Sequence, residues 1–476
     1  MIRIKSSTQS ALTMKAVLDI GKTNVKLSLM DDNRLKVASF SRKNNSIFAD
    51  FYPHADVAGI WDWLVEVLNG CVYAKQITAF IVTTHGATAA LVNKDLPGDG
   101  LVLPIMDYEF SGVESCNQSY DMVRPEFTET LSPNLPAGLN LGRQLFWLEK
   151  KFPTQFSGAS HLLMYPQYWG WRLTGQMATE VTSLGCHTDL WAPVNKHYSS
   201  LVARCDWERL MPPLEPAWQE LGCVNTQVAE QIGLLTDCKV YVGLHDSNAS
   251  YSRYLLASHK PGAAFAVIST GTWTILMQAN GNLAALGDKR DTLANCDISG
   301  EPVACARFMG GREYELICQR LGSDINEPIS YKTIQTALNY LWMVTPDFSD
   351  GNGPFAGMTP IISCPQTAAS AVATLYYALM IDQRLTDLQS TGPIYIEGSI
   401  LKNSLLCSLV AQLRTGQAVY LSTDDTGTVQ GALLLTIAKG TPVELELEPC
   451  LSADFKGLIE YRTYWLGQFA RPVTHL

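Results

Sequence analysis

A chain of 476 residues exceeds what one hydrophobic core usually organises, so we expect two domains. The composition, 47% hydrophobic and 17% charged, is that of a globular protein, and no run approaches the roughly 20 apolar residues of a membrane helix. The net charge of −10 argues against non-specific binding to nucleic acid, which depends on neutralising phosphates with Lys and Arg. We therefore expect neither a nucleic acid nor a membrane as partner.

The cysteines and the N-terminus bear on the cellular compartment. The 12 cysteines are scattered and form no Cys-x-x-Cys pair, so we expect reduced thiols that serve as small core residues. Residues 1–13 lack the apolar segment of a secretory signal and predict a flexible leader, with Met14 as an alternative start. A cytoplasmic protein is the expectation.

The first half alternates between predicted strands and helices. In chain order we expect strands at 15–30 and 34–40, a helix at 61–68, strands at 77–83 and 101–106, helices at 141–151 and 168–173, and a strand at 240–244. Several strands run into polar residues at their carboxyl ends, where open α/β sheets place ligands. A polar segment that ends in Pro261-Gly262 separates an N-terminal domain of residues 14–257 from a C-terminal domain of residues 258–476.

The second half opens with a new set of strands at Ala263. In chain order we then expect a helix at 312–321, a helix at 368–388, a strand at 394–396, a helix at 403–413, a strand at 418–421 and a helix at 427–439. No repeat of 20–50 residues runs through the chain. The internal similarity that remains is a pair of hairpins, one in each half.

The first hairpin has the form of a phosphate-binding turn. Residues 17–27 run as an apolar strand, a polar turn at 21–24 and a second apolar strand. Asp19 closes the first strand, where its carboxylate can hold Mg²⁺, and the N–H groups and the Thr23 hydroxyl of the turn can meet phosphates. The Walker pattern is excluded, because Ala16 stands where that pattern needs a Gly. The alternative is a plain hairpin in which Asp19 caps its own turn.

The same form recurs in the second half. Residues 267–276 run as two apolar strands around Ser269-Thr270-Gly271-Thr272, whose backbone and hydroxyl donors suit a phosphate. For either hairpin alone, an ordinary turn is an equal alternative. Two of them, one in each half, favour a nucleotide held between two related domains, as in a phosphotransferase or an ATPase.

Asp246 follows the strand predicted at 240–244 and begins a helix. From its position alone, a helix N-cap is the ordinary alternative. In phosphoryl transfer the protein mainly positions groups and offsets charge, and a carboxylate that accepts the proton of the attacking hydroxyl is a usual chemical contribution. One Asp can fill both roles. A base at this position would activate an acceptor hydroxyl, and this distinguishes a kinase from a plain ATPase.

The order of these motifs resembles that of the FGGY carbohydrate kinases. From about Met14 to about Ala438 the chain carries, in sequence, Asp-x-Gly-x-Thr-Asn, Gly-x-His-Asp, Ser-Thr-Gly-Thr-Trp and Gly-x-x-x-Lys-Asn. The resemblance implies an α/β fold of two domains, of the actin/hexokinase/Hsp70-like (ribonuclease H-like) class, with the active site in the cleft between them. Within the family, residues 245–250, 267–273 and 306–311 are most similar to the rhamnulokinase and fuculokinase branch.

The resemblance also implies roles for single residues. Asp246 would be the general base, and Asp19 and Asp246 would be the carboxylates at Mg²⁺. The nucleotide would be bound by Gly21, Lys22, Thr23, Asn24, Thr270, Gly271, Thr272, Gly398, Ser399 and Asn403. The sugar would be bound by His85, Gly86, Asp107, His245 and Asp246. A satisfied structural histidine is the alternative for His85, and a turn former is the alternative for Asp107.

Two further sugar contacts, His187 and Trp169, are weaker candidates. The chain also departs from the family pattern at two places. The adenosine motif usually has consecutive glycines, whereas here Ser399 and Ile400 follow Gly398, and a β-branched residue predicts a narrower adenine pocket. Lys22 stands where small residues are common. It would add charge against the γ-phosphate or point to solvent.

The sequence therefore predicts an ATP- and Mg²⁺-dependent kinase. Its substrate would be a small sugar, a ketose or deoxyketose similar to rhamnulose, fuculose or xylulose, and a homodimer would be in keeping with the family. Two alternatives remain. One is a degenerate relative that binds a sugar or nucleotide as a sensor, and the other is a sugar-independent ATPase of the actin or Hsp70 type.

Overall fold

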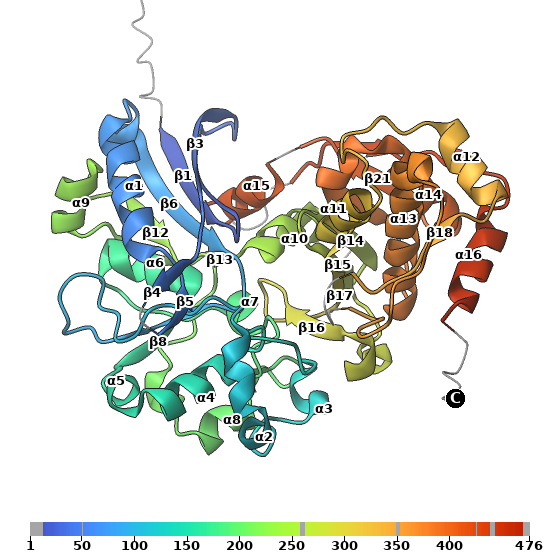
Figure 1. The fold of residues 1–476 in the computed structure, drawn as a ribbon. Coiled ribbons are helices and arrows are strands. Elements are labelled where there is room, and N and C mark those ends of the chain that lie inside the picture. The colour runs from blue at the N-terminus through green and yellow to red at the C-terminus, as the bar shows by residue number, and fades with distance from the viewer. Residues whose placement is uncertain are drawn as a thin grey trace, which may run out of the picture.

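The computed structural model describes residues 13–49, 51–257, 262–348, 353–424, 426–437 and 443–469. The predicted leader lies outside these residues apart from Thr13, as do residues 258–261 at the predicted domain boundary and residues 438–439 at the end of the helix predicted at 427–439. The chain folds into two halves, each built around its own mixed sheet, as Figure 1 shows.

The N-terminal sheet begins with the first hairpin. Its strands run in the order β11-β12-β6-β1-β2-β3, with β13 also paired to β6. Their bounds are β1 Met14–Ile20, β2 Asn24–Met30, β3 Lys36–Lys43, β6 Ile77–Thr84, β11 Glu220–Cys223, β12 Lys239–Tyr241 and β13 Leu244–His245. Apolar side chains of these strands pack against α1 (Val57–Gly70), α6 (Tyr165–Thr174) and α9 (Thr226–Ile232) in one core. α6 ends where Gly175 takes φ 78°, the left-handed conformation that favours glycine.

The rest of the N-terminal half forms a second core beside that sheet. It consists of short elements, which Figure 1 shows grouped below the sheet. Their bounds are β4 Ile47–Ala49, β5 Tyr52–His54, β7 Ala89–Val92, α2 Asn117–Tyr120, α3 Phe127–Thr130, α4 Leu141–Lys151, α5 Pro153–Ser157, β8 His161–Met164, α7 Val181–Leu184, β9 Trp191–Ala192, β10 His197–Tyr198 and α8 Ser200–Arg204.

The C-terminal sheet begins with the second hairpin. Its strands run in the order β16-β17-β15-β14-β20-β21-β22. Their bounds are β14 Phe265–Thr270, β15 Thr274–Ala279, β16 Thr292–Cys296, β17 Pro302–Phe308, β20 Ile394–Gly398, β21 Val419–Ser422 and β22 Leu447–Pro449. One face packs on helices in a large core, with α13 at its centre. The remaining elements of this half are α11 Gly310–Arg320, α12 Tyr331–Asn339, β18 Met343–Val344, β19 Ile362–Ser363, α13 Ala369–Asp387, α14 Ser404–Leu413 and α16 Leu458–Gly467.

The two hairpins occupy equivalent places in the two sheets. In the first half, β1 pairs antiparallel with β2 and parallel with β6. In the second half, β14 pairs antiparallel with β15 and parallel with β20. The turn after the first strand therefore lies at the same edge of each sheet. The internal similarity predicted from the two hairpins extends to the topology around them.

Two helices join the halves. α10 (Asp246–Ala257) ends the first half, and α15 (Gly427–Leu434) belongs to the second half in sequence. α15 nevertheless packs on α10, β1 and β6, and Figure 1 shows it against the N-terminal half. Apolar residues of both halves share the resulting core, among them Val17, Ile81 and Leu433. A sequence boundary near residue 258 therefore does not separate every element in space.

The structure corrects two sequence-based expectations. The strand predicted at 101–106 is absent, since Leu101 and Met106 form only isolated bridges, and Pro104 between them has no N–H to donate. Trp169 is fully buried in the core of the first sheet, so a role in stacking on the sugar is wrong. Among the described residues, no helix is long and apolar enough to cross a membrane.

Candidate active site

A cavity of about 290 Å³ lies between the two halves and is lined by both. The N-terminal half contributes the first turn, the segment after β6 and the start of α10. The C-terminal half contributes the second turn and one face of its sheet. The residues predicted from the sequence that line it are Lys22, Thr23, His85, Gly86, His187, His245, Asp246, Thr270, Gly271 and Thr272. The structure thus brings together residues that lie up to 250 positions apart in the chain.

The first turn is held by hydrogen bonds, one within the turn and two from Asn44, which follows β3. Gly21 N donates to Asn24 O at 3.0 Å, which closes the turn. Asn44 donates from its side chain to Gly21 O at 2.7 Å and from its backbone to Thr23 O at 3.0 Å. Thr23 is exposed, and it faces the cavity. Asp19, Gly21 and Asn24 are not among the residues that line the cavity.

Lys22 lies on the side of the cavity where the sugar contacts were predicted. Its ammonium group pairs with Asp107, lies 3.7 Å from Glu109 and stands 4.7 Å from the centre of the Tyr108 ring. The Lys22 ammonium group therefore neither points freely to solvent nor stands as an unpaired cation beside the first turn. The structure answers the question that the sequence left open about this lysine: its charge is matched by carboxylates.

Asp107 itself lines a smaller recess beside the main cavity. One of its oxygens accepts from Lys22 and from the Glu109 backbone at 2.9 Å, and the other accepts from Ser46. Burial opposes its ionised form, but these hydrogen bonds prevail and lower the pKa of the Asp107 carboxyl. In this state Asp107 is a charged partner of Lys22.

The second turn is tied to the start of the adenosine motif. The Thr270 hydroxyl donates to Glu397 O at 2.6 Å and accepts from Ile400 N at 3.0 Å. Gly398 has φ 89°, and a Cβ on it would lie 2.1 Å from Thr270 O. The Thr270 side chain therefore holds two segments together, while Gly271 and Thr272 remain on the cavity surface.

Asp246 begins α10 at the cavity. Its Oδ1 accepts from Ser247 N at 2.6 Å and lies 3.3 Å from His245 Nε2. Its other oxygen, Oδ2, has no hydrogen-bond partner among the described residues. The carboxylate is thus held by one oxygen and open at the other, which is the arrangement that a general base needs.

His245 and Cys186 form a buried pair beside Asp246. Cys186 Sγ lies 3.8 Å from His245 Nε2, and the other ring nitrogen of His245 lies 2.9 Å from Asn248 Oδ1. Burial opposes the charged form of each group. The negative charges of Cys186 and Asp246 nevertheless raise the pKa of His245, and His187 and His245 lower the pKa of the Cys186 thiol. His245, Cys186 and Asp246 therefore form one electrostatically connected cluster at the cavity.

Asp19 and Asp246 are close enough to repel each other. Burial, and then the charge of Asp246, raise the pKa of Asp19 from its ordinary value of 3.8 to about 7. No group of three or more His, Cys, Asp or Glu that could hold a metal occurs within the described residues. Mg²⁺ is commonly bound through only one or two carboxylates together with substrate phosphates. The pair therefore fits Mg²⁺, whose charge would relieve the repulsion.

The adenosine motif lies in a separate recess of about 460 Å³. Ser399 and Asn403 line it. The Asn403 side chain caps α14 by accepting from Leu406 N at 3.1 Å. Ile400 is 4% exposed and packs in the core, and it also lines this recess. The narrowing of an adenine pocket by its β-branched side chain stays a prediction. Gly311 lines this recess and approaches Gly271 of the second turn so closely that a Cβ would lie 2.1 Å from its carbonyl oxygen.

The side of the cavity where the sugar contacts were predicted contains His85, Gly86 and Tyr108. The His85 ring lies 5.4 Å from the Tyr108 ring, and burial lowers the pKa of His85. Gly86 allows His245 to approach, since a Cβ there would lie 2.9 Å from its Nε2. His187, at φ 43°, places its Nδ1 2.7 Å from Leu139 O at the cavity edge. His187 therefore lines the cavity, and its contact with the sugar stays a prediction.

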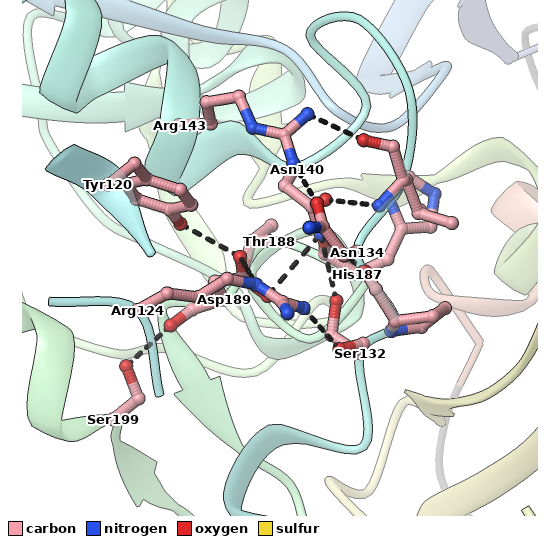
Figure 2. A network of polar contacts seen from close by, with 12 residues as sticks. Tyr120, Arg124, Ser132, Asn134, Asn140, Arg143, His187, Thr188, Asp189 and Ser199 are labelled. Atoms are coloured by element: carbon pink, nitrogen blue, oxygen red, sulfur yellow. Dashed lines mark hydrogen bonds and ion pairs between the residues drawn. The ribbon is translucent and has the colours of Figure 1, made fainter. Parts of the chain in front are cut away.

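A buried polar network surrounds Asp189 and reaches the backbone of His187, as Figure 2 shows. Asp189 accepts from the Tyr120 hydroxyl at 2.8 Å and from Arg124 Nε at 2.9 Å. Asn140 donates to His187 O at 3.1 Å and to Asp189 Oδ1 at 3.3 Å. The network fixes the loop that ends at Leu139 and the backbone of His187. None of these supporting residues was predicted from the sequence.

The structure adds cavity residues that sequence reasoning missed. Asn295 on β16 and Arg307 on β17 are both buried and line the cavity from the C-terminal half. A sequence signal existed for each, because a polar residue interrupts an otherwise apolar strand. Arg307 also lies within the segment 306–311 that resembles one branch of the family. Their partners could not be deduced without the sheet register.

Comparison with known proteins agrees with this geometry. The model of the FGGY family of carbohydrate kinases, N-terminal domain, matches residues 14–251, and the model of carbohydrate kinase FGGY, C-terminal domain, matches residues 262–444. The chain belongs to the FGGY family of carbohydrate kinases. The family and the two-domain fold predicted from the sequence are thereby confirmed.

Two curated relatives in the FGGY family are named as kinases of different sugars. The chain is 26% identical over 281 residues to the L-fuculokinase of Salmonella typhi, which covers 56% of this chain and 57% of that protein. It is 23% identical over 273 residues to a probable L-xylulose kinase of Haemophilus influenzae, which covers 54% of each. The matches thus span just over half the length of these relatives.

Solved structures of the family match over nearly the whole chain. A carbohydrate kinase from Novosphingobium aromaticivorans is 33% identical, with a TM-score of 0.84 over 96% of this chain and 98% of that chain. A ligand-bound xylulose kinase from Lactobacillus acidophilus is 15% identical, with a TM-score of 0.77 over 96% of each chain. At that identity the second comparison shows the fold alone.

Proposed function

We propose that this FGGY family member is an ATP-dependent sugar kinase that phosphorylates a hydroxyl of a ketose or deoxyketose. One observation carries the proposal: both phosphate-type turns and Asp246 line the same cavity between the halves. The turns would hold the terminal phosphates. Asp246 would accept the proton of the sugar hydroxyl as it attacks the γ-phosphate.

The neighbouring groups support these roles. Asp246 Oδ2, which has no hydrogen-bond partner among the described residues, leaves one position for a substrate hydroxyl, while Oδ1 lies 3.3 Å from His245 Nε2. The recess with Ser399 and Asn403 would receive the nucleoside, and it meets the second turn at Gly311. Asp19 and Asp246 would hold Mg²⁺, which offsets phosphate charge when it is bound. The names L-fuculokinase and L-xylulose kinase among the relatives favour a ketose.

The location of the cavity supports a closing motion as well. It lies between a domain of residues 14–257 and a domain of residues 258–476, in the division that we propose. Closing the halves on the sugar would exclude water and so suppress hydrolysis of ATP. Such a site would make turnover dependent on the sugar.

The test begins with a screen of ketopentoses and 6-deoxyketohexoses for sugar-dependent release of ADP. With the best sugar, Asp246→Asn is expected to lower kcat by about 10²- to 10⁴-fold, the usual contribution of a general base. Calorimetry should show that this variant still binds the nucleotide. Asp237→Asn, an exposed carboxylate away from the cavity, serves as the matched control and should keep normal turnover.

The same measurements separate the alternatives. Near-normal kinase activity of Asp246→Asn would contradict the role of Asp246. Binding of a sugar without release of ADP from any nucleotide would indicate a sensor. ATP turnover that ignores every sugar would indicate an ATPase of the actin or Hsp70 type.

A further inference from the structure

One face of the C-terminal sheet is turned toward the cavity. Ser269 pairs with Ile275, Ile275 with Arg307, and Leu293 with Cys305 across neighbouring strands. Side chains of paired residues share a face, and residues two apart along a strand do so as well. Asn295 therefore lies on the same face as Leu293, and Arg307 on the same face as Cys305. All of these residues line the cavity.

On this face two side chains carry polar atoms that lack a partner. Arg307 is 5% exposed, and neither its Nε nor its Nη2 has a hydrogen-bond partner among the residues that the structure describes. Asn295 is 3% exposed, and its Oδ1 likewise has none. Buried polar atoms are nearly always paired, because leaving one unpaired is costly. Two unpaired groups that face one cavity indicate a ligand that pairs with both.

The charges around Arg307 restrict the chemistry of that ligand. Asp291 Oδ1 lies 3.5 Å from Arg307 Nε, close enough to balance its charge without a hydrogen bond. The guanidinium also stands 4.9 Å from the centre of the Trp273 ring. Because the charge is already matched, Arg307 offers donors more than it offers an unbalanced cation. This arrangement suits a neutral acceptor better than a phosphate or a carboxylate.

Asn295 points to the same conclusion. Its free atom is an amide oxygen, which accepts hydrogen bonds and does not donate them. An ionised phosphate or carboxylate has no proton to give it. A sugar hydroxyl can donate to Asn295 and accept from Arg307, so a polyol is the chemistry that satisfies both residues.

The position of Arg307 across the cleft also favours the sugar. Tyr108 lies opposite, beside His85 on the predicted sugar side. Burial raises the pKa of Tyr108, neighbouring carboxylates raise it further, and the charge of Arg307 opposes this rise. Arg307 is thus electrostatically close to Tyr108.

We propose that Asn295 and Arg307 are substrate-binding residues by which the C-terminal half holds hydroxyl groups of the acceptor sugar. The inference rests on the proposed function and adds the second half of the sugar site. The N-terminal half supplies Asp246, and the C-terminal half supplies one acceptor and two donors. The sugar then binds tightly only when both halves contact it.

The first experiment measures steady-state kinetics of Arg307→Lys with the best ketose from the screen. Lysine keeps the charge beside Asp291 but lacks the Nε and Nη2 donors. We expect the KM for the sugar to rise by about 10- to 100-fold, in line with a lost hydrogen bond from a charged donor, while the KM for ATP stays within about twofold. A rise in the KM for ATP with an unchanged KM for the sugar would overturn the proposal and assign Arg307 to the phosphates.

The second experiment uses Asn295→Leu together with sugar analogues that each lack one hydroxyl. One analogue should bind equally weakly to the wild-type protein and to the variant, because the same hydrogen bond is absent in both cases. Calorimetry gives the dissociation constants without turnover. If every analogue loses the same factor in both proteins, Asn295 contacts no hydroxyl and the proposal fails.

One control separates an effect on folding from an effect on sugar binding. A comparison of outcomes then separates a failure of this inference from a failure of the proposed function. Gln278→Leu removes a buried amide from the opposite face of the same sheet and should change Tm but not the KM for the sugar. If calorimetry shows that Arg307→Lys and Asn295→Leu weaken sugar binding in a protein that releases no ADP, the kinase function fails and the inference stands. If sugar is phosphorylated but both variants keep the wild-type KM, only the inference fails.

Discussion

Asp19 is a carboxyl group whose surroundings oppose its ionised form. It ends β1 close to Asp246, and burial together with that neighbour raises its pKa to about 7. Lys26 opposes the rise but does not cancel it. Ionising this buried carboxyl group at neutral pH costs folding free energy, and a bound cation would offset that cost. Its cost to stability depends on pH, and this dependence is measurable.

We expect Asp19→Asn to stabilise the metal-free protein at pH 8 and to stabilise it only about a third as much at pH 5. Between an unfolded value of 3.8 and a folded value of about 7, the folded protein keeps a proton that the unfolded chain has released. Stability therefore falls as pH rises through that window, and Asn, which cannot ionise, avoids the loss. Thermal unfolding without Mg²⁺ at the two pH values measures it. An equal shift of Tm at both would contradict the assigned pKa.

At the scale of elements, the contact between α10 and α15 positions Asp246, the proposed general base. Gly431 lies where the two helices cross, and a Cβ on it would lie 1.7 Å from Ala249 O. This is close approach of backbone to backbone, which only glycine permits. α10 begins with Asp246, so a shift of this helix is transmitted to the cavity.

Gly431→Ala is expected to destabilise the protein by about 1 to 3 kcal/mol, the usual range for overpacking, and to lower kcat by moving Asp246. Urea unfolding and turnover with the best sugar measure the two effects. Gly416→Ala is the matched control, since a Cβ there meets nothing within 4 Å. A Gly431→Ala variant as stable and active as the Gly416→Ala variant would show that the helices can separate at no cost.

At the scale of the whole molecule, the two halves are not independent. α15 comes from the second half and covers the N-terminal sheet, where Val17 and Ile81 share a core with Val429 and Leu433. The strand topology around the hairpins repeats in the two sheets, but this crossing helix does not follow the sequence boundary. The cavity and the shared core therefore lie on the same contact between the halves.

We expect a fragment of residues 14–257 to expose the apolar surface that α15 covers in the full chain. Such a surface binds hydrophobic dyes and promotes association. Fluorescence of 8-anilinonaphthalene-1-sulfonate should be several-fold higher with the fragment than with the full chain, and light scattering should show oligomers. A monomeric fragment without dye binding would mean that the N-terminal half closes its own core.

Much of the site could be predicted from the sequence, because local patterns determine local structure. The alternation of apolar residues around Gly21 and Gly271 specifies hairpins, and Asp246 at a strand end specifies a carboxylate at a sheet edge. The failure at 101–106 is equally local, since an apolar run containing Pro104 cannot complete a ladder of hydrogen bonds.

The sequence by itself determined the two related halves, the two turns and the position of Asp246 among them. Only the tertiary structure decided that Lys22 pairs with Asp107, that the Thr270 hydroxyl ties β14 to β20, and that polar atoms of Arg307 and Asn295 at the cavity have no hydrogen-bond partner among the described residues. The reason is physical. A turn forms from neighbouring residues, whereas the partner of a side chain depends on strand registers and on helices that arrive from far along the chain.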